Sequence, residues 1–274
     1  MVSQEQRRRQ LAREKFLRQQ QRRTSARRRA RMRNSVIASV LGVVVIGSVA
    51  LYTTGVLKND DKADNAGSDV TPSASATPSK APDPCEKAAK GSVQKLSWKK
   101  EPAMSIDTSA KYTMKLATTC GDIGVALKTS AAPHTVNSFD FLAGKGYFDH
   151  TKCHRLTTNG IYVLQCGDPT GTGSGGPGYT IPDENLKDKS LKGNVYPAGT
   201  VAMANTGQKH TGGSQFFLVY QDSQLPPSYT PFGTVDAAGM KVLKKIAAAG
   251  ESTGQGDGAP NATVVIDKAT VTKS

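Results

Sequence analysis

Apolar and polar residues alternate along much of the C-terminal half of the chain, as they do in β-strands that bury one face. The first such stretch, residues 112–130, alternates on either side of Cys120, Gly121 and Asp122, which predicts two strands joined by a tight turn at Gly121. Similar short runs, separated by glycine-rich segments, follow at residues 152–158, 160–168, 199–206, 214–221, 232–237 and 262–273.

Two stretches of the same region have the periodicity of amphipathic helices instead. The first begins at Pro133, which suits a first helical turn, and ends at Gly144 or Gly146. The second covers residues 237–250 and ends at a glycine. Many short strands combined with only two helices predict a mainly β fold, an antiparallel β-barrel that is closed or partly closed.

A long apolar stretch near the N-terminus has neither of these patterns. Residues 35–57 are 23 residues without a charged side chain, and as a helix they would extend about 34 Å, enough to cross a hydrocarbon core of about 30 Å. We therefore expect an uncleaved transmembrane helix. A cleavable signal peptide is the alternative, because Ser48-Val49-Ala50 resembles a cleavage site, but the apolar stretch is longer than is usual for such a signal.

Charge is distributed very unevenly along the chain. Of the net charge of +14, residues 1–33 contribute +11, from 13 Lys and Arg against Glu5 and Glu14, and only +3 lies beyond them. The folded part is therefore not a basic nucleic-acid-binding domain. The excess of cations before the apolar stretch places the N-terminus in the cytoplasm and the domain outside the cell membrane. We expect the tail to bind anionic membrane lipids, with ribosomal RNA, a translocon or another cytoplasmic partner as alternatives.

The segment after the apolar stretch is rich in Ser, Thr, Ala, Pro and Asp. It has too few apolar side chains to offset the entropy lost on folding, so we expect a disordered linker. The expected organisation is a basic cytoplasmic tail at residues 1–34, a transmembrane helix at 35–57, the linker at 58–84, an N-terminal extension at 85–110 and the domain at 111–274.

All four cysteines lie on the exported side of the linker, where disulfides form. They allow two disulfides in three possible pairings, and the sequence does not choose among the pairings. We expect at least one bridge to attach the segment around Cys85 to the domain. There is no CxxC sequence and no zinc-ligand spacing of cysteines and histidines, so we expect neither a metal nor a cofactor. The cysteines are Cys85, Cys120, Cys153 and Cys166.

Several familiar motifs do not fit their required context. Residues 171–176 formally match the GxGxxG of dinucleotide-binding proteins, but Pro177 and Pro182 follow where that motif requires a helix. The chain contains no GxSxG, HExxH or P-loop sequence. Asn261 begins a formal glycosylation acceptor, a match so short that we attribute it to chance.

A series of motifs follows in the C-terminal part of the chain, at residues 148–156, 161–168, 171–178, 203–205, 213–217 and 231–233. In this order the motifs resemble those of the cyclophilin family of peptidyl-prolyl cis/trans isomerases. The resemblance covers about residues 111–272 and implies a closed, eight-stranded antiparallel β-barrel with two capping helices. Membrane-tethered, extracytoplasmic members of this kind are typical of Gram-positive bacteria, and we expect a monomer.

The resemblance also implies which residues are functional. Arg155 would be the catalytic donor to the prolyl nitrogen and Gln165 would orient its guanidinium, because a hairpin could place both on one face. His154 points the other way and would be a satisfied structural histidine, and Phe216 would belong to the core. The substrate-binding residues would be Tyr162, Val163, Phe217, Leu225 and Tyr229 around the proline ring, and Ala204, Asn205, Thr206 and Gln215 along the peptide.

The chain departs from the family pattern at several positions. Cys153 replaces an aromatic residue, and the hairpin loop at residues 157–160 is longer than in common members. Tyr162 replaces a phenylalanine and Val163 a methionine, so the pocket stays apolar with a different shape. Gln224 stands where cyclosporin-sensitive members carry tryptophan, which predicts weak binding of that drug without loss of catalysis.

These observations lead us to expect an exported peptidyl-prolyl isomerase that assists the folding of secreted and cell-envelope proteins. Its substrates would be proline-containing segments of exported proteins, whose X-Pro bonds otherwise isomerise over tens of seconds or more. The alternative is a non-catalytic module that holds proline-containing peptides as a chaperone or scaffold.

Overall fold

The computed structural model describes residues 82–274. The expected basic tail, the expected transmembrane helix and nearly all of the expected linker therefore lie outside the described residues. Between residues 82 and 274, no helix is both long enough and apolar enough to cross a membrane.

Short strands and two helices make up the described region, in agreement with the mainly β fold predicted from the sequence. The strands are β1 (Tyr112–Thr118), β2 (Gly121–Leu127), β3 (Thr151–Lys152), β4 (Arg155–Thr157), β5 (Val163–Cys166), β6 (Val195–Tyr196), β7 (Thr200–Met203), β8 (Phe216–Val219), β9 (Ser223–Gln224), β10 (Pro231–Val235), β11 (Asp257–Gly258) and β12 (Val265–Lys273), and the helices are α2 (Pro133–Gly144) and α3 (Ala237–Ala248).

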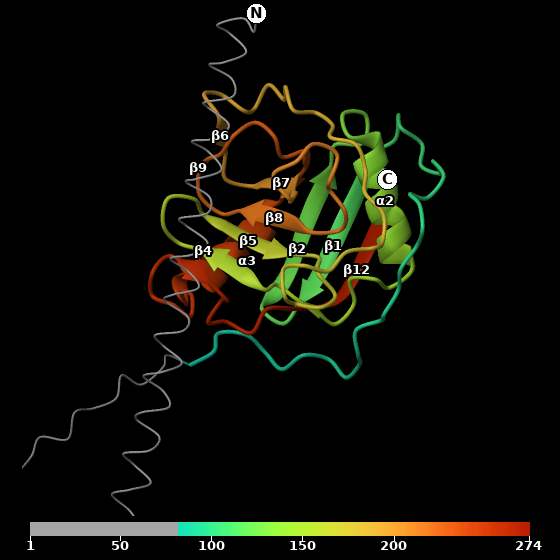
Figure 1. Ribbon diagram of the computed structural model, residues 1–274. Helices are drawn as coiled ribbons and strands as arrows, with labels where there is room; N and C mark the ends of the chain where they lie inside the picture. Colours follow the sequence, from blue (N-terminus) through green and yellow to red (C-terminus); the bar gives the residue numbers. More distant parts are fainter. Residues whose placement is uncertain (1–81) are drawn as a thin grey trace, which may run out of the picture. The chain divides into compact units, whose positions relative to one another are not determined.

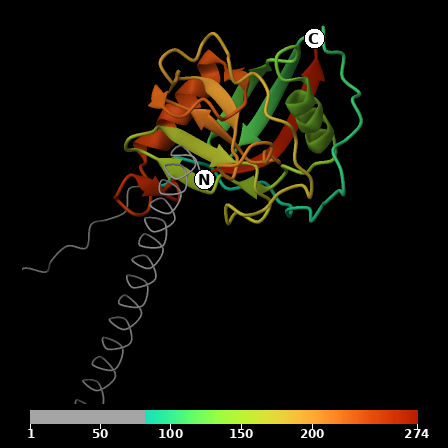
Figure 2. The same cartoon turned by 45° about the horizontal axis from the view of Figure 1, so that its top comes forward.

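One antiparallel sheet of ten strands, in the order β11-β4-β5-β8-β7-β10-β2-β1-β12-β3, forms the body of the domain, and β6 pairs separately with β9. The sheet curls, as Figures 1 and 2 show. Only Cys153 and His154 separate β3, at one end of the sheet, from β4, which lies next to the other end. The chain itself therefore connects the two ends of the sheet.

The number of strands differs from the eight that we expected. Among the described residues one curled sheet has ten strands, and no ladder joins its two edge strands, β11 and β3. Both edge strands are only two residues long. A strand of two residues is too short to show an alternation of apolar and polar residues, so the sequence does not reveal it.

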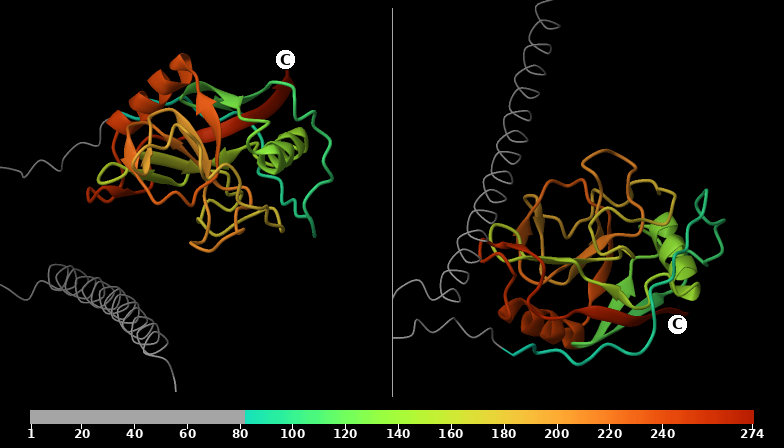
Figure 3. Two further views of the ribbon diagram at one scale, coloured as in Figure 1. Left: turned by 90° about the horizontal axis from the view of Figure 1, so that it is seen from above. Right: turned by 60° about the horizontal axis from the view of Figure 1, so that its bottom comes forward.

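The two helices lie at different ends of the curled sheet (Figures 1 and 3). Helix α2 begins at Pro133 and ends at Gly144, as predicted, and the carboxylate of Glu184 accepts hydrogen bonds from the first-turn N–H groups of His134 and Thr135. Helix α3 begins after Asp236, whose side chain accepts a hydrogen bond of 2.6 Å from an N–H of the first turn. Both predicted helices are confirmed.

The hydrophobic core consists of two clusters on opposite faces of the central strands. In the larger cluster, Phe139 of α2 packs its ring against Phe148, Phe216 and Phe232, with ring centroids 4.6 to 5.4 Å apart. The smaller cluster contains Phe217. Since neighbouring residues in a strand face opposite ways, the placement of Phe216 and Phe217 in different clusters confirms the expected division.

The segment before β1, coloured blue-green in Figures 1 and 3, wraps around the domain without regular secondary structure. A disulfide between Cys85 and Cys120 attaches its start to the β1–β2 hairpin, which confirms the expected bridge to the Cys85 segment. Further along, the Trp98 N–H donates to the carbonyl of Pro177 at 2.8 Å. The second disulfide joins Cys153 to Cys166.

Candidate functional site

Four residues from four adjacent strands form a row across one face of the sheet. Arg155 of β4 pairs with Gln165 of β5, Gln165 with Phe217 of β8, and Phe217 with Ala202 of β7. Directly paired residues of antiparallel strands point to the same face. The row therefore brings a guanidinium, a primary amide and an aromatic ring together, with neighbouring strands about 4.8 Å apart. The predicted pairing of Arg155 with Gln165 is confirmed.

Arg155 has two hydrogen-bonding partners in this row and beside it. Its Nη1 donates to Oε1 of Gln165 at 3.2 Å, while Nε and Nη2 donate to the two carboxylate oxygens of Asp257 at 2.7 and 2.8 Å. The hydrogen bonds to Arg155 lower the pKa of Asp257, and the same bonds raise the pKa of Arg155. The guanidinium is thus charged and held from two sides.

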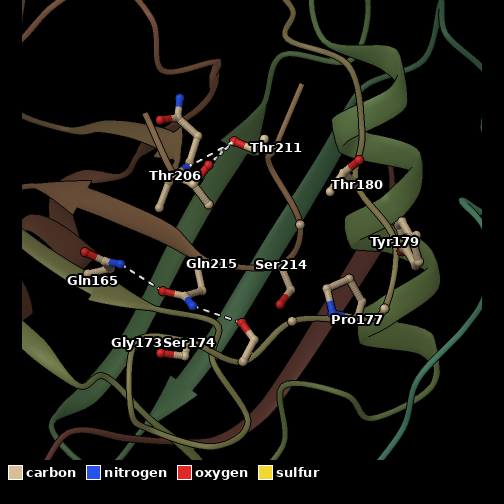
Figure 4. Close-up of a pocket in the computed structure, with 16 residues that line it drawn as sticks. Gln165, Gly173, Ser174, Pro177, Tyr179, Thr180, Thr206, Thr211, Ser214 and Gln215 are labelled. Atoms are coloured by element: carbon tan, nitrogen blue, oxygen red, sulfur yellow. Dashed lines mark hydrogen bonds between the residues drawn. The ribbon is translucent and has the colours of Figure 1, made fainter. Parts of the chain in front are cut away.

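A second glutamine continues the network into a cavity. Gln165 donates through Nε2 to Oε1 of Gln215 at 2.9 Å, and Gln215 donates through its own Nε2 to the carbonyl of Gly175 at 2.9 Å (Figure 4). Each amide in this series accepts from one neighbour and donates to the next. The orientation of Arg155 is therefore linked to the loop that carries Gly175.

The cavity beside these glutamines has a volume of about 700 Å³. In Figure 4, Thr206 and Thr211 lie on one side of it and Pro177 and Tyr179 on the other. The Thr206 N–H and hydroxyl both donate to the hydroxyl oxygen of Thr211, at 3.1 and 3.0 Å. The lining residues are Gln165, residues 173–180, residues 204–206, Thr211 and residues 213–215. Thus Ala204, Asn205, Thr206 and Gln215, all predicted substrate-binding residues, share one cavity with Gln165.

The buried loop residue Asp168 fixes the wall of the cavity. Its carboxylate accepts hydrogen bonds from the N–H and hydroxyl of Thr170 and from the N–H groups of Thr172 and Gly173, at 2.6 to 3.1 Å. Burial alone would raise the pKa of Asp168, but these hydrogen bonds outweigh it and lower the pKa. The glycine-rich loop that formally matched GxGxxG is followed by no helix before α3, and it lines this cavity instead.

An apolar surface lies at the other end of the row. Phe217 and Tyr229 meet edge to face with ring centroids 5.4 Å apart. The backbone of Tyr229 is held by the buried Tyr196, whose hydroxyl donates to the Tyr229 carbonyl at 2.8 Å and accepts from its N–H at 3.2 Å. The buried members of this cluster are Val163, Tyr196, Ala202, Phe217, Val219 and Leu225.

One predicted pocket residue lies apart from this cluster. Tyr162 packs against the larger core cluster and its ring faces Tyr220 at 5.9 Å, because it precedes Val163 on the strand and points to the opposite face.

His154 also differs from expectation. Neither of its ring nitrogens has a hydrogen-bond partner among the described residues, so it is not a satisfied histidine, and burial lowers its pKa.

Sequence reasoning missed two residues of the site. Asp257 lies in a glycine-rich stretch without alternation, and its only signal was a charged residue between two glycines. Tyr196 lies in a two-residue strand and gave no periodic signal. The unexpected Cys153, by contrast, is explained by its disulfide to Cys166, which crosses the hairpin next to both Arg155 and Gln165.

Residues 82–274 contain no cluster of three or more His, Cys, Asp or Glu side chains that could hold a metal ion. The groups that the site offers are hydrogen-bond donors, one fixed positive charge and an apolar surface.

Comparison with known proteins agrees with this geometry. Residues 113–271 match the family model described as cyclophilin type peptidyl-prolyl cis-trans isomerase. A probable peptidyl-prolyl cis-trans isomerase B of Mycobacterium leprae is 51% identical over 166 residues, which cover 58% of this chain and 56% of that protein. The protein of the same name from Mycobacterium tuberculosis is 48% identical over 165 residues, 57% of this chain and 53% of that protein. The chain thus spans about half the length of these curated relatives.

A solved structure shares the fold. The cyclophilin type peptidyl-prolyl cis-trans isomerase of Cryptosporidium parvum is 27% identical, with a TM-score of 0.50, and the match covers 60% of this chain and 99% of that chain.

Proposed function

Because the chain belongs to the cyclophilin-type peptidyl-prolyl cis-trans isomerase family, we propose that it catalyses rotation about X-Pro peptide bonds. The observation that carries this proposal is the row of Arg155, Gln165 and Phe217 across three adjacent strands. The row combines the two features that the reaction requires, a donor for the prolyl nitrogen and an apolar surface for the proline ring.

The barrier to this rotation, about 18 to 20 kcal/mol, comes from resonance in the amide bond. When the bond twists, resonance is lost and the prolyl nitrogen becomes pyramidal, with a lone pair that can accept a hydrogen bond. A donor fixed where this lone pair forms stabilises the twisted state more than either planar state. Arg155 is charged and already oriented by Gln165 and Asp257, so it can supply this hydrogen bond without rearrangement.

The surroundings of Arg155 support assignments for the other predicted residues. In our proposal the proline ring lies against Val163, Phe217, Leu225 and Tyr229, which are adjacent in the smaller apolar cluster. The peptide on the other side of the X-Pro bond lies along the cavity, with its backbone beside residues 204–206 and the Gln215 side chain. Tyr162 would contact substrate only with the outer edge of its ring, because it packs on the larger core cluster.

The cellular setting is also part of the proposal. Two disulfides in the described region suit an oxidising compartment, and the charge distribution before residues 35–57 suits a single membrane anchor with a cytoplasmic N-terminus. We propose that the isomerase acts as a membrane-tethered monomer outside the cytoplasm on proline-containing segments of exported proteins. Its basic tail would lie on anionic lipids, and nucleic acid would not be a partner.

The test compares the purified full chain with its Arg155→Ala and Arg155→Lys variants in the isomerisation of a short X-Pro peptide. We expect catalysis by the wild type and a decrease of kcat/KM by about one to two orders of magnitude in Arg155→Ala. Arg155→Lys should also lose activity, because an ammonium group cannot replace the planar fork that Asp257 and Gln165 hold. A folded wild type that binds the peptide without accelerating isomerisation would leave only the peptide-binding alternative.

A further inference from the structure

The two-residue strand β11 brings a carboxylate directly onto the catalytic arginine. Asp257 pairs with Thr157 across the ladder between β11 and β4, two residues from Arg155. Both oxygens of its carboxylate accept hydrogen bonds from the guanidinium, at 2.7 and 2.8 Å. This is the bidentate arrangement that fixes the plane as well as the position of an arginine side chain.

The loop that carries Asp257 has its own anchor. The buried carboxylate of Glu251 accepts hydrogen bonds from the N–H and hydroxyl of Thr253 and from the N–H of Gly256, at 2.6 to 2.8 Å. Gly256 has a φ of 91°, and a Cβ on it would collide with Asn159 of the long hairpin loop. The Thr158 N–H donates to the Gly256 carbonyl at 2.9 Å. The conformation of this loop therefore leaves little freedom for Asp257.

Arg155 keeps donors that no neighbouring side chain occupies. A guanidinium has five N–H groups. Asp257 accepts from Nε and from one N–H of Nη2, and Gln165 accepts from one N–H of Nη1. One N–H on each Nη atom is left. The one on Nη2 points away from the Nε side that Asp257 occupies, toward the terminal edge of the guanidinium. Asp257 thus occupies the lateral edge and leaves the terminal edge for substrate.

We propose that Asp257 is a positioning residue of the isomerase site, which holds the guanidinium of Arg155 so that its terminal N–H groups face the twisted X-Pro bond. The inference deepens the proposed function and rests on it. A stabilising role alone is a poor account of the contact, since the side chains of Arg155 and Asp257 are 38% and 55% exposed. Exposed ion pairs contribute little to folding stability.

The chain offers a matched control. Asp122 forms an ion pair of the same length, 2.7 Å, with Lys115 on the β1–β2 hairpin, and the Asp122 side chain is 58% exposed. The substitution Asp122→Asn therefore removes a comparable surface charge and ion pair outside the site. Asp257→Ala removes the whole carboxylate, whereas Asp257→Asn keeps a single acceptor oxygen for Arg155.

The experiment measures kcat and KM of the full chain for a short X-Pro peptide. We expect Asp257→Ala to lower kcat about ten-fold with KM changed by less than about two-fold, and Asp257→Asn to lie between it and the wild type. Asp122→Asn should match the wild type. In an Arg155→Ala background, Asp257→Ala should change kcat/KM by less than about two-fold, because it acts only through the arginine.

Three results would overturn the inference: Asp257→Ala as active as Asp122→Asn, Asp257→Ala more active than the wild type, or an equal loss with and without Arg155. A wild type without activity would instead refute the proposed function. The positioning claim is then decided by the NMR signal of the Arg155 Nε–H group in the full chain. We expect its hydrogen exchange to be slow in the wild type and in Asp122→Asn but fast in Asp257→Ala, and equal exchange in all three would refute it.

Discussion

At the scale of single residues, the site depends on how firmly one flexible side chain is held. Arg155 contacts Gln165 and Asp257, and Gln165 is in turn held by Gln215. Ordering a long side chain costs rotamer entropy. If the Arg155 side chain is already ordered in the folded protein, its loss of rotamer entropy is not subtracted from the free energy with which it stabilises the twisted peptide. Activity should therefore be sensitive to substitutions of the neighbours that hold Arg155 in place.

The substitution Gln165→Met tests this dependence. Methionine has nearly the length of glutamine but neither accepts from Arg155 nor donates to Gln215, so the guanidinium loses one of its two constraints. We expect kcat to fall by about five- to ten-fold, with little change in thermal stability because Gln165 is only half-buried. Peptide isomerisation and thermal unfolding of the same preparation measure both effects. An unchanged kcat would show that the amide does not orient Arg155.

Asp168 should give the stability of the protein a distinct pH dependence. The pKa of its carboxyl in the folded protein is lower than the ordinary value of 3.8, so the carboxylate stabilises the fold fully above that value and loses its contribution as the pH falls through the folded pKa. In Asp168→Asn, the new NH2 group faces N–H donors, and we expect a loss of about 3 kcal/mol at pH 7.

Urea unfolding of the wild type and of Asp168→Asn at pH 7 and at pH 3 tests this expectation. The difference in unfolding free energy should become smaller at pH 3, below the ordinary pKa of 3.8, because the carboxyl of the unfolded wild type takes up a proton there and unfolding becomes more favourable. A difference that is the same at both pH values would show that the charge of Asp168 does not stabilise the loop.

At the scale of elements, the sequence predicted those parts of the site that follow from the period of a strand. The hairpin predicted at residues 152–168 could place Arg155 beside Gln165, as the structure does. The alternation along residues 214–221 separated Phe216 from Phe217. The same rule, applied strictly, separates Tyr162 from Val163, and the structure follows the rule.

The parts that could not be predicted depend on contacts between distant segments. Strand β11 lies in a glycine-rich loop, where hydrogen bonds to Glu251 and the close contact of Gly256 with Asn159 determine the conformation. No local pattern of apolar residues reports such contacts. For the same reason the two edge strands of the sheet, β3 and β11, each of two residues, were not foreseen.

The two disulfides should separate stability from activity. Chain-entropy arguments give about 4 kcal/mol for the 35-residue separation of Cys85 and Cys120 and about 3 kcal/mol for the 13-residue separation of Cys153 and Cys166. Only the second bridge lies beside Arg155 and Gln165. We expect both double Cys→Ala variants to lose stability, and only the Cys153/Cys166 variant to lose several-fold in kcat.

Thermal unfolding and peptide isomerisation, measured below the melting temperature of each variant, distinguish the two effects. Equal kcat in the two variants would mean that the Cys153–Cys166 bridge has no part in positioning the arginine.

At the scale of the whole domain, the N-terminal extension packs against the back of the loop that lines the cavity. Its backbone bonds to Pro177, and a Cβ on Gly178 would collide with Ser97 and Trp98. The cavity wall is therefore packed between the extension on its outer side and the glutamine network on its inner side.

Trp98 is the residue that fastens the extension to the cavity wall. Its ring packs edge to face on Phe141, with centroids 5.0 Å apart, and lies 6.0 Å from the ring of Tyr147. Its backbone N–H donates to the carbonyl of Pro177. Because the ring is partly buried, we expect Trp98→Ala to cost about 2 kcal/mol, less than the 3 to 5 kcal/mol typical of a fully buried aromatic residue. We also expect faster amide exchange in residues 173–180, and a higher KM with little change in kcat, because the wall of the cavity is loosened while Arg155 stays in place. Trp98→Phe, which keeps most of the ring contact, is the control. Hydrogen exchange in residues 173–180 that is the same in Trp98→Ala and in the wild type would show that the extension covers the domain without supporting its binding cavity.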